Sequence, residues 1–205
     1  MQSGAIRPIP NMLPRSLFSA EHDAFRDSAR KFYEKEVVPN IAKYEQQQHV
    51  DRDLWNKAGE LGLLCTTISE AYGGSGVDRL YSMILIEEQA YAMDSATGFS
   101  LHSDIVANYI NNFGTTEQKQ HWLPRMATGE VITAIAMTEP GTGSDLQAVR
   151  TSAVLDGDEY VINGAKIFEL INKFIASLPN GYRAFGIGTH RKARYIQISG
   201  FFLNT

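Results

Sequence analysis

The sequence is short of the features that mark secreted, membrane-spanning or nucleic-acid-binding proteins. Cys65 is its single cysteine, so no disulfide can form within the chain. That scarcity fits a reducing compartment, and Cys65 itself is expected to be a small buried apolar residue. No apolar run approaches the ~20 residues that span a bilayer. The net charge of −4 argues against nucleic-acid binding.

The composition is that of a globular protein, with 43% hydrophobic and 20% charged residues. A chain of 205 residues can form one large domain or two small ones. Residues 1–18 contain Arg7 and Arg15 and no acidic residue, which is typical of a mitochondrial import signal. Three prolines there disfavour an amphipathic helix. We therefore expect a flexible leader, and a truncated import signal is the alternative.

Between residues 19 and 130, apolar side chains recur at helical spacing in five stretches. Ser19, Asp51 and Thr116 are the expected N-caps of the first, second and fifth helices. Val37-Val38-Pro39 predicts an interruption after the first helix, and Gly62 ends the second. The predicted core positions are Phe25, Ala29, Phe32, Tyr33, Leu54, Trp55, Ala58, Leu61, Leu80, Ile84, Leu85, Tyr91, Leu101, Ile105, Tyr109, Ile110, Trp122 and Met126.

From residue 131 to 168 the pattern changes to that of strands. Residues 131–137 are apolar and partly β-branched, which predicts a strand. Residues 151–155 and 159–162 flank Asp156-Gly157-Asp158 and predict a β-hairpin. A further strand is expected at 165–168. The predicted fold is therefore mainly α with a small β part.

The run Thr-Glu-Pro-Gly-Thr-Gly-Ser-Asp at residues 138–145 carries most of the functional information. A turn of this composition can expose backbone N–H groups and hydroxyls on one side, which suits an anionic or polar-edged cofactor. Gly141 and Gly143 allow a ligand to approach the backbone closely. The alternative is a simple connection to the hairpin, with Asp145 capping a turn.

Residues 19–168 resemble the N-terminal part of the acyl-CoA dehydrogenase family. The resemblance rests on sequence motifs that occur in the family's order, and the Phe-Ser-Leu-His-Ser-Asp run at 99–104 favours the long-chain branch. The matching segments are 19–23, 29–33, 54–59, 62–64, 87–91, 98–106, 136–145 and 163–166.

The resemblance implies an N-terminal helical domain, a middle β-domain and a C-terminal helical bundle, with FAD between the last two. The implied reaction converts fatty acyl-CoA thioesters to trans-2-enoyl-CoA in fatty-acid β-oxidation. A glutamate removes the α-proton, and the β-hydrogen leaves as hydride to the flavin. Electrons then pass to electron-transferring flavoprotein. The family also implies a homotetramer in the mitochondrial matrix.

The family's first flavin-contact segment matches residues 135–144. By that match Met137 packs beside the flavin, and Thr138 offers its hydroxyl and amide to the ring's polar edge. Gly143 permits close backbone approach, and Ser144 lies where flavin and acyl-CoA meet. The implied FAD-binding residues are Ile135, Ala136, Met137, Thr138, Gly143, Ser144 and Phe168, with Ser144 also binding substrate. The resemblance implies no metal ligand.

The family pattern stops at Phe168. Leu170 stands where the family has a hydroxyl that hydrogen-bonds the flavin, and leucine has no donor. Residues 169–205 carry a net charge of +4, against −8 for residues 1–168. A solvated basic terminus or a different coding origin would explain this tail. Arg183-Ala184-Phe185-Gly186 resembles a family FAD contact by chance, because prolines and glycines around it exclude the required helix.

No catalytic residue is assigned, because the resemblance places the glutamate base beyond residue 205. We interpret Glu87 and Glu88 as part of a helix face, Glu139 as a turn residue, and His102 as a hydrogen-bonded core histidine. The predicted regions are a leader (1–18), a helical domain (19–130), the start of the β-domain (131–168) and a divergent tail (169–205). Two alternatives stay open: a non-catalytic truncated fragment or splice product, and a flavoprotein oxidase or monooxygenase of the same fold.

Overall fold

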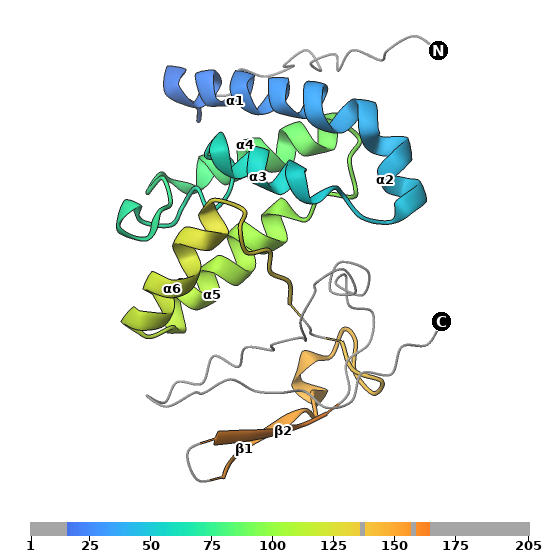
Figure 1. The fold of residues 1–205 in the computed structure, drawn as a ribbon, viewed down its shortest axis with the longest axis vertical. Helices are drawn as coiled ribbons and strands as arrows, with labels where there is room; N and C mark the ends of the chain where they lie inside the picture. The colour runs from blue at the N-terminus through green and yellow to red at the C-terminus, as the bar shows by residue number, and fades with distance from the viewer. Residues whose placement is uncertain (1–15, 136–137, 157–158, 165–205) are drawn as a thin grey trace. The chain divides into compact units, whose positions relative to one another are not determined.

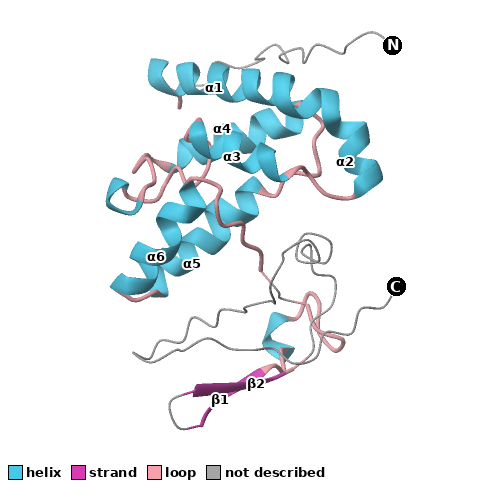
Figure 2. Ribbon diagram, viewed as in Figure 1, coloured by secondary structure: helices cyan, strands magenta, loops and turns pink. Residues whose placement is uncertain are grey.

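The computed structural model describes residues 16–135, 138–156 and 159–164. The chain divides into two compact units (Figure 1). Residues up to Asn111 and Thr116–Thr133 belong to the first unit, and Asn112–Thr115 and the residues from Ala134 onward belong to the second. The first unit is helical, and the second contains the β-hairpin (Figure 2). The predicted leader up to residue 15 and the predicted tail lie outside the described residues.

Helix α1 (Ala20–Phe32) begins at the predicted cap. The Ser19 hydroxyl accepts the His22 amide, and His22 Nδ1 accepts the Ser19 amide at 3.1 Å, which completes a capping box. The helix runs into a π-helical turn (Tyr33–Val37) and a 3₁₀ turn (Val38–Asn40) containing Pro39, which confirms the predicted interruption. Helix α2 (Ile41–Gln47) follows and ends at Gln48, whose φ is 61°.

Helices α3 (Arg52–Glu60) and α4 (Arg79–Tyr91) confirm the second and third predicted helices. The predicted Asp51 cap is wrong in one respect. Asp51 precedes α3, but its side chain makes no capping bond and instead accepts hydrogen bonds from Lys43 and Gln47. The charged amine of Lys43 outcompetes the backbone amides. Helix α4 is capped by Asp78, whose carboxylate accepts the Leu80 amide at 2.8 Å.

A 3₁₀ turn (Glu70–Tyr72) separates α3 from α4. After α4, a π-helical turn (Leu101–Val106) leads into α5 (Ala107–Phe113), and α6 (Thr116–Ala127) completes the helical set (Figure 1). These elements confirm the fourth and fifth predicted helices. Helix α1 packs against α4, while α6 packs against the Glu70–Tyr72 turn and the π-helical turn.

The apolar core of the helical unit consists of two clusters of buried side chains. Most predicted core positions belong to these clusters or pack against them, but the side chains of Leu61, Ile105 and Tyr109 are exposed, that of Leu61 by 60%. Leu61 lies beyond the last residue of α3, where the chain turns at Gly62. A π-helical turn contains more than 3.6 residues, so the i, i+4 spacing from Leu101 no longer returns to one face.

The predicted hairpin is confirmed. Strands β1 (Ser152–Asp156) and β2 (Glu159–Asn163) pair antiparallel, from Ser152 opposite Asn163 to Asp156 opposite Glu159. The strand predicted at 131–137 is wrong over residues 131–135, which have no strand structure. The Val131 amide donates to the Arg125 carbonyl and the Thr133 amide to His102 Nδ1. Both amides therefore hydrogen-bond to residues of the helical unit and not to a neighbouring strand. The strand predicted at 165–168 lies outside the described residues.

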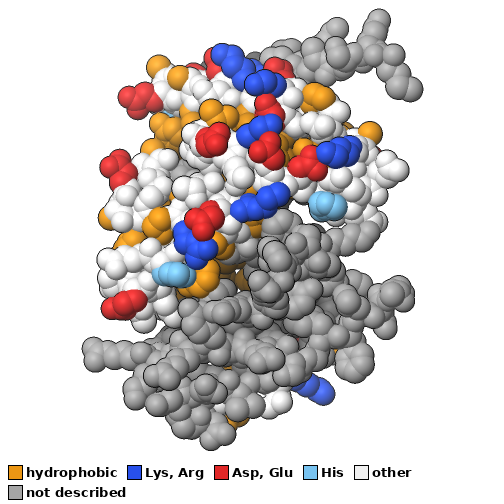
Figure 3. Space-filling view, in the orientation of Figure 1, with side chains coloured by type: hydrophobic (Ala, Val, Ile, Leu, Met, Phe, Trp, Pro, Cys, Tyr) orange, Lys and Arg blue, Asp and Glu red, His pale blue; other side chains and the backbone are white. Residues whose placement is uncertain are grey.

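The face of the helical unit drawn in Figure 3 carries acidic and basic side chains interspersed with apolar ones. Within the described residues, no helix is both long enough and apolar enough to cross a bilayer.

Candidate flavin-binding turn

The turn at residues 138–145 is closed by a pair of backbone hydrogen bonds. The Glu139 amide donates to the Thr142 carbonyl at 3.3 Å, and the Thr142 amide donates to the Glu139 carbonyl at 3.0 Å. Pro140 and Gly141 form its tip. Among the predicted site residues, Thr138 and Ile135 are half-buried, while Gly143 and Ser144 are exposed. Ala136, Met137 and Phe168 lie outside the described residues.

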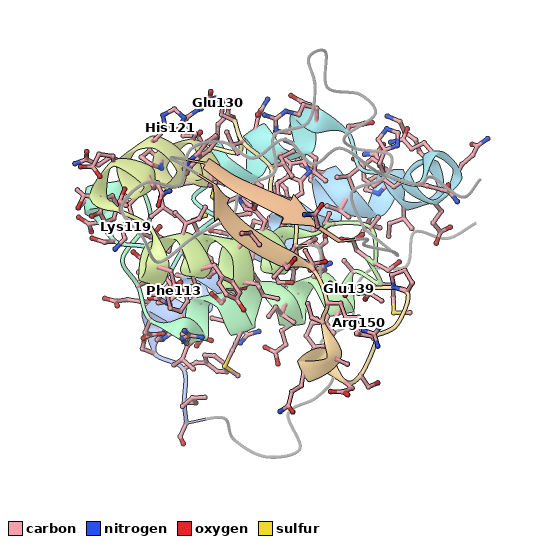
Figure 4. The ribbon with its side chains drawn as sticks, turned by 90° about the horizontal axis from the view of Figure 1, so that it is seen from below. Phe113, Lys119, His121, Glu130, Glu139 and Arg150 are labelled. Atoms are coloured by element: carbon pink, nitrogen blue, oxygen red, sulfur yellow. The ribbon has the colours of Figure 1, made fainter. Side chains whose placement is uncertain are left out.

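The buried carboxylate of Glu139 fastens this turn to the start of β1. Its Oε2 accepts the Arg150 amide at 2.7 Å, and its Oε1 accepts the Thr151 amide at 3.0 Å. Figure 4 shows Glu139 and Arg150 close together. Both oxygens are therefore engaged in holding backbone, which confirms Glu139 as a turn residue.

Asp145 organises the other side of the turn. Its carboxylate accepts the Gln147 amide at 3.1 Å, and its carbonyl accepts the Ala148 amide at 3.3 Å. The 3₁₀ turn Leu146–Ala148 begins there. The predicted capping by Asp145 is confirmed, and it coexists with the features that favour a ligand.

Three features make the turn suitable for a polar-edged ligand. A Cβ added to Gly141 or Gly143 would meet nothing within 4 Å, so the surface there is open to close approach. No described residue accepts a hydrogen bond from the amides of Gly143 and Ser144. The Thr142 hydroxyl is buried and has no hydrogen-bond partner among the described residues. Open space beside uncommitted donors is what the phosphate or ring edge of a dinucleotide requires.

The segment that leads into the turn, residues 128–133, is held tightly by the helical unit. A Cβ on Gly59 of α3 would lie 2.3 Å from the Thr128 carbonyl oxygen, and one on Gly129 would lie 2.3 Å from that of Trp55. The Arg52 guanidinium donates to the carbonyls of Gly129 and Glu130. Backbone therefore packs directly on backbone here, an arrangement that the sequence pattern did not predict.

His102 holds the end of the same segment. It is fully buried, and its ring packs edge-on against Trp55 with centroids 5.2 Å apart. Its Nδ1 lies 3.2 Å from the Thr133 amide nitrogen, and its Nε2 lies 3.1 Å from the Met126 carbonyl oxygen. Burial lowers the pKa of His102 to about 4, partly opposed by the hydrogen bond to Met126. The predicted hydrogen-bonded core histidine is confirmed.

Three other titratable groups have structural roles. Cys65 is buried as predicted, and burial raises the pKa of its thiol to about 12. Burial also raises the pKa of Asp104, which hydrogen-bonds Ser82. Glu88 of α4 is fully buried and accepts hydrogen bonds from Arg26 and Arg30 of α1, so it has no capacity to act as a base. The described residues hold no group of three or more potential metal ligands.

Comparison with known proteins places these features in one family. Residues 19–130 match the family model described as "Acyl-CoA dehydrogenase, N-terminal domain". The chain is 49% identical over 168 residues to the mitochondrial long-chain specific acyl-CoA dehydrogenase of Sus scrofa, covering 82% of this chain and 39% of that protein. It thus spans about two fifths of the length of this relative.

Two solved structures extend the comparison to the fold. The acyl-CoA dehydrogenase of Geobacillus kaustophilus superposes with a TM-score of 0.72 at 48% identity, over 76% of this chain and 41% of that one. An acyl-CoA dehydrogenase from Bacillus anthracis, solved in complex with FAD, gives a TM-score of 0.64 at 34% identity. That match covers 75% of this chain and 27% of the other.

Proposed function

The chain belongs to the acyl-CoA dehydrogenase family, and we propose that it serves the FAD-dependent dehydrogenation of fatty acyl-CoA thioesters to trans-2-enoyl-CoA. It would supply the helical domain and the first flavin-contact segment. The observation that carries the proposal is the turn at 138–145, whose glycines are open and whose Gly143 and Ser144 amides donate to no described residue, which leaves room for a cofactor. The related Bacillus anthracis enzyme was solved in complex with FAD, which supports the choice of cofactor.

Within this proposal, the turn binds the polar parts of FAD. The amides of Gly143 and Ser144 and the hydroxyls of Thr138 and Ser144 are the donors, and Ser144 also contacts acyl-CoA. Ile135, Ala136, Met137 and Phe168 contribute apolar or backbone contacts. Glu139 and Asp145 keep the turn in shape without touching the ligand. When bound, FAD accepts the substrate's β-hydrogen as hydride.

By the family resemblance, the base that removes the α-proton lies outside residues 19–168. The carboxylates of Glu88 and Glu139 are both consumed by structural hydrogen bonds. The pig relative is named as a long-chain enzyme of mitochondria, which supports long-chain fatty acyl-CoA as substrate and the mitochondrial matrix as location. Electron-transferring flavoprotein as electron acceptor, a homotetrameric assembly and a role in fatty-acid β-oxidation complete the proposal.

A chimera tests this function directly. Residues 19–168 replace the matching part of the pig long-chain enzyme, which supplies the remaining flavin contacts and the base. We expect the purified chimera to carry stoichiometric oxidised flavin that is bleached by palmitoyl-CoA. Thr138→Val and Ser144→Ala should each weaken FAD binding about tenfold, because each removes one hydrogen bond between neutral groups. Ser152→Ala, on the exposed start of β1, is the matched control. A folded but colourless chimera would contradict the proposal.

A second candidate is a non-catalytic form that keeps the helical domain without turnover. The observation that favours it is Leu170, which has no donor where the family has a hydroxyl. The visible spectrum of the purified 205-residue chain distinguishes the two. A flavin spectrum that bleaches with palmitoyl-CoA would eliminate the non-catalytic form. A soluble, colourless chain beside a yellow chimera would support it.

A further inference from the structure

The hydrogen bonds of His102 assign its tautomer. The Met126 carbonyl can only accept, so Nε2 carries the proton. The Thr133 amide can only donate, so Nδ1 is the acceptor. The Thr133 hydroxyl lies 2.9 Å from the same nitrogen. A proton on Nδ1 would face the amide proton of Thr133 and break this bond.

The imidazole has no freedom to choose another arrangement. It lies on the π-helical turn Leu101–Val106, where His102 and the next residue, Ser103, are both buried. The Ser103 hydroxyl accepts the Cys65 amide at 3.0 Å, which fixes the turn from the other side. The Trp55 ring packs against the imidazole, and the Cys65 sulfur lies 3.9 Å from Nε2. Rotating the ring would break both of its backbone bonds at once.

Thr133 is the last residue of the helical unit, and only Ala134 separates it from the flavin-contact segment at 135–144. Successive Cα atoms are about 3.8 Å apart, so Ile135 begins within about 7.6 Å of the anchored residue. Two residues earlier, the Val131 amide donates to the Arg125 carbonyl at 2.9 Å. The hydrogen bond from the Thr133 amide to His102 therefore holds the last residue of the helical unit in place.

We propose that His102, through its Nδ1 bond to the Thr133 amide, is a positioning residue that sets where the flavin-contact segment begins. The inference rests on the proposed function for what the segment binds, while the anchoring itself does not. His102 is not a catalytic residue, because it acts only through Thr133. A misplacement of about 1 Å at a binding segment is enough to weaken function strongly.

A pair of substitutions separates the two bonds of the ring. His102→Asn places an amide oxygen near the position of Nδ1 and keeps an acceptor for Thr133. His102→Gln places an amide nitrogen near Nε2 and keeps a donor for Met126, but leaves the Thr133 amide without its partner. Thr133→Val removes only the hydroxyl and is the matched control, because the amide remains.

The readout is amide hydrogen exchange in the intact 205-residue chain, followed by mass spectrometry. We expect His102→Gln to speed exchange in peptides covering 131–138 by about tenfold, the loss of one hydrogen bond. Peptides from α1 and α4 should be unchanged, and His102→Asn and Thr133→Val should stay close to the parent. Unchanged exchange at 131–138 in His102→Gln, or equal acceleration in every peptide, would overturn the proposal.

Two further measurements keep the proposal independent of variant folding and of the proposed function. Nitrogen-15 NMR of the unmodified chain should find His102 in the Nε2–H tautomer at neutral pH, and an Nδ1–H or doubly protonated ring would overturn it. In the pig chimera, His102→Gln should weaken FAD binding more than His102→Asn. A chimera that does not bind FAD at all would contradict the proposed function. If the two His102 variants bind FAD equally well in the chimera although amide exchange at 131–138 differs, His102 anchors Thr133 but does not affect cofactor binding.

Discussion

Arg30 of α1 grips the fully buried carboxylate of Glu88 on α4 with two nitrogens. Its Nε lies 2.9 Å from Oε2, and its terminal nitrogen lies 3.1 Å from Oε1. Arg26 approaches the same carboxylate at 3.1 Å. Hydrogen bonding to Glu88 raises the pKa of Arg30, so the guanidinium stays charged. This cluster of charged side chains holds α1 against α4.

Replacing Glu88 with glutamine should destabilise the helical unit by about 3 kcal/mol, because Arg30 and Arg26 lose the buried charge that they share, although Arg26 keeps its ion pair with Glu87. Urea unfolding followed by circular dichroism measures this. Glu21→Gln, on the exposed first turn of α1, is the matched control and should cost less than about 1 kcal/mol. A Glu88→Gln variant as stable as the control would show that the cluster does not hold α1 to α4.

Gly59→Ala should destabilise the protein by about 2–3 kcal/mol. The new Cβ would lie 2.3 Å from the Thr128 carbonyl oxygen, so α3 must move away from the segment that leads to the candidate flavin-binding turn. Gly98→Ala is the control, because a Cβ there meets nothing within 4 Å. That variant should be neutral or more stable by up to about 1 kcal/mol. Equal unfolding midpoints for the two variants would rule out the close packing.

Stability should fall as the pH drops from 6.5 to about 4, in part because of His102. The folded ring takes up a proton only near pH 4, because burial disfavours its charge, whereas the unfolded ring does so near 6.5. The unfolded chain therefore binds more protons in this window, and stability rises with pH across it. The neutral His102 ring contributes about 3 kcal/mol to the free energy of unfolding, and this contribution is fully present above pH 6.5.

His102→Asn removes this titration while keeping an acceptor for Thr133. The difference in unfolding free energy between parent and variant should therefore change by about 3 kcal/mol between pH 7 and pH 4. Taking this difference cancels the contributions of the titratable groups that the two proteins share. Arg52 is the charged residue whose field further lowers the pKa of His102. A difference that is independent of pH would contradict the buried neutral imidazole.

Glu139→Gln should loosen the candidate flavin-binding turn without unfolding the helical unit. Glutamine offers one acceptor where the carboxylate holds the amides of Arg150 and Thr151, so one amide loses its partner. In the pig chimera we expect FAD affinity to fall about tenfold. The Glu130 carboxylate pairs with Arg125 near the surface, so Glu130→Gln is the control and should leave the FAD affinity unchanged. Equal flavin affinity in both variants would show that Glu139 does not shape the turn.

Local sequence signals predicted the elements that local interactions make. The Ser19 cap, the pairing of β1 with β2 and the Asp145 turn all depend on partners a few residues away. The motif at 138–145 also predicted an open turn with two unobstructed glycines. Resemblance to a family, rather than spacing, was needed to connect that turn with FAD.

Tertiary partners explain what the sequence did not predict. Residues 131–135 have the composition of a strand, yet the Val131 amide bonds to Arg125 and the Thr133 amide to His102. Asp51 has the identity and position of a cap, yet Lys43 attracts its carboxylate. His102 and Thr133 are 31 residues apart, and no local periodicity indicates that they meet. The tight approach of Gly59 to Thr128 has the same long-range origin.

The visible spectrum of the pig chimera, before and after palmitoyl-CoA, tests the central claim most directly. Residues 19–168 should support stoichiometric oxidised flavin that substrate bleaches, and Thr138→Val should lower the flavin content while Ser152→Ala does not. A helical, soluble chimera without flavin, or one whose flavin content ignores Thr138, would contradict the assignment of this turn to FAD.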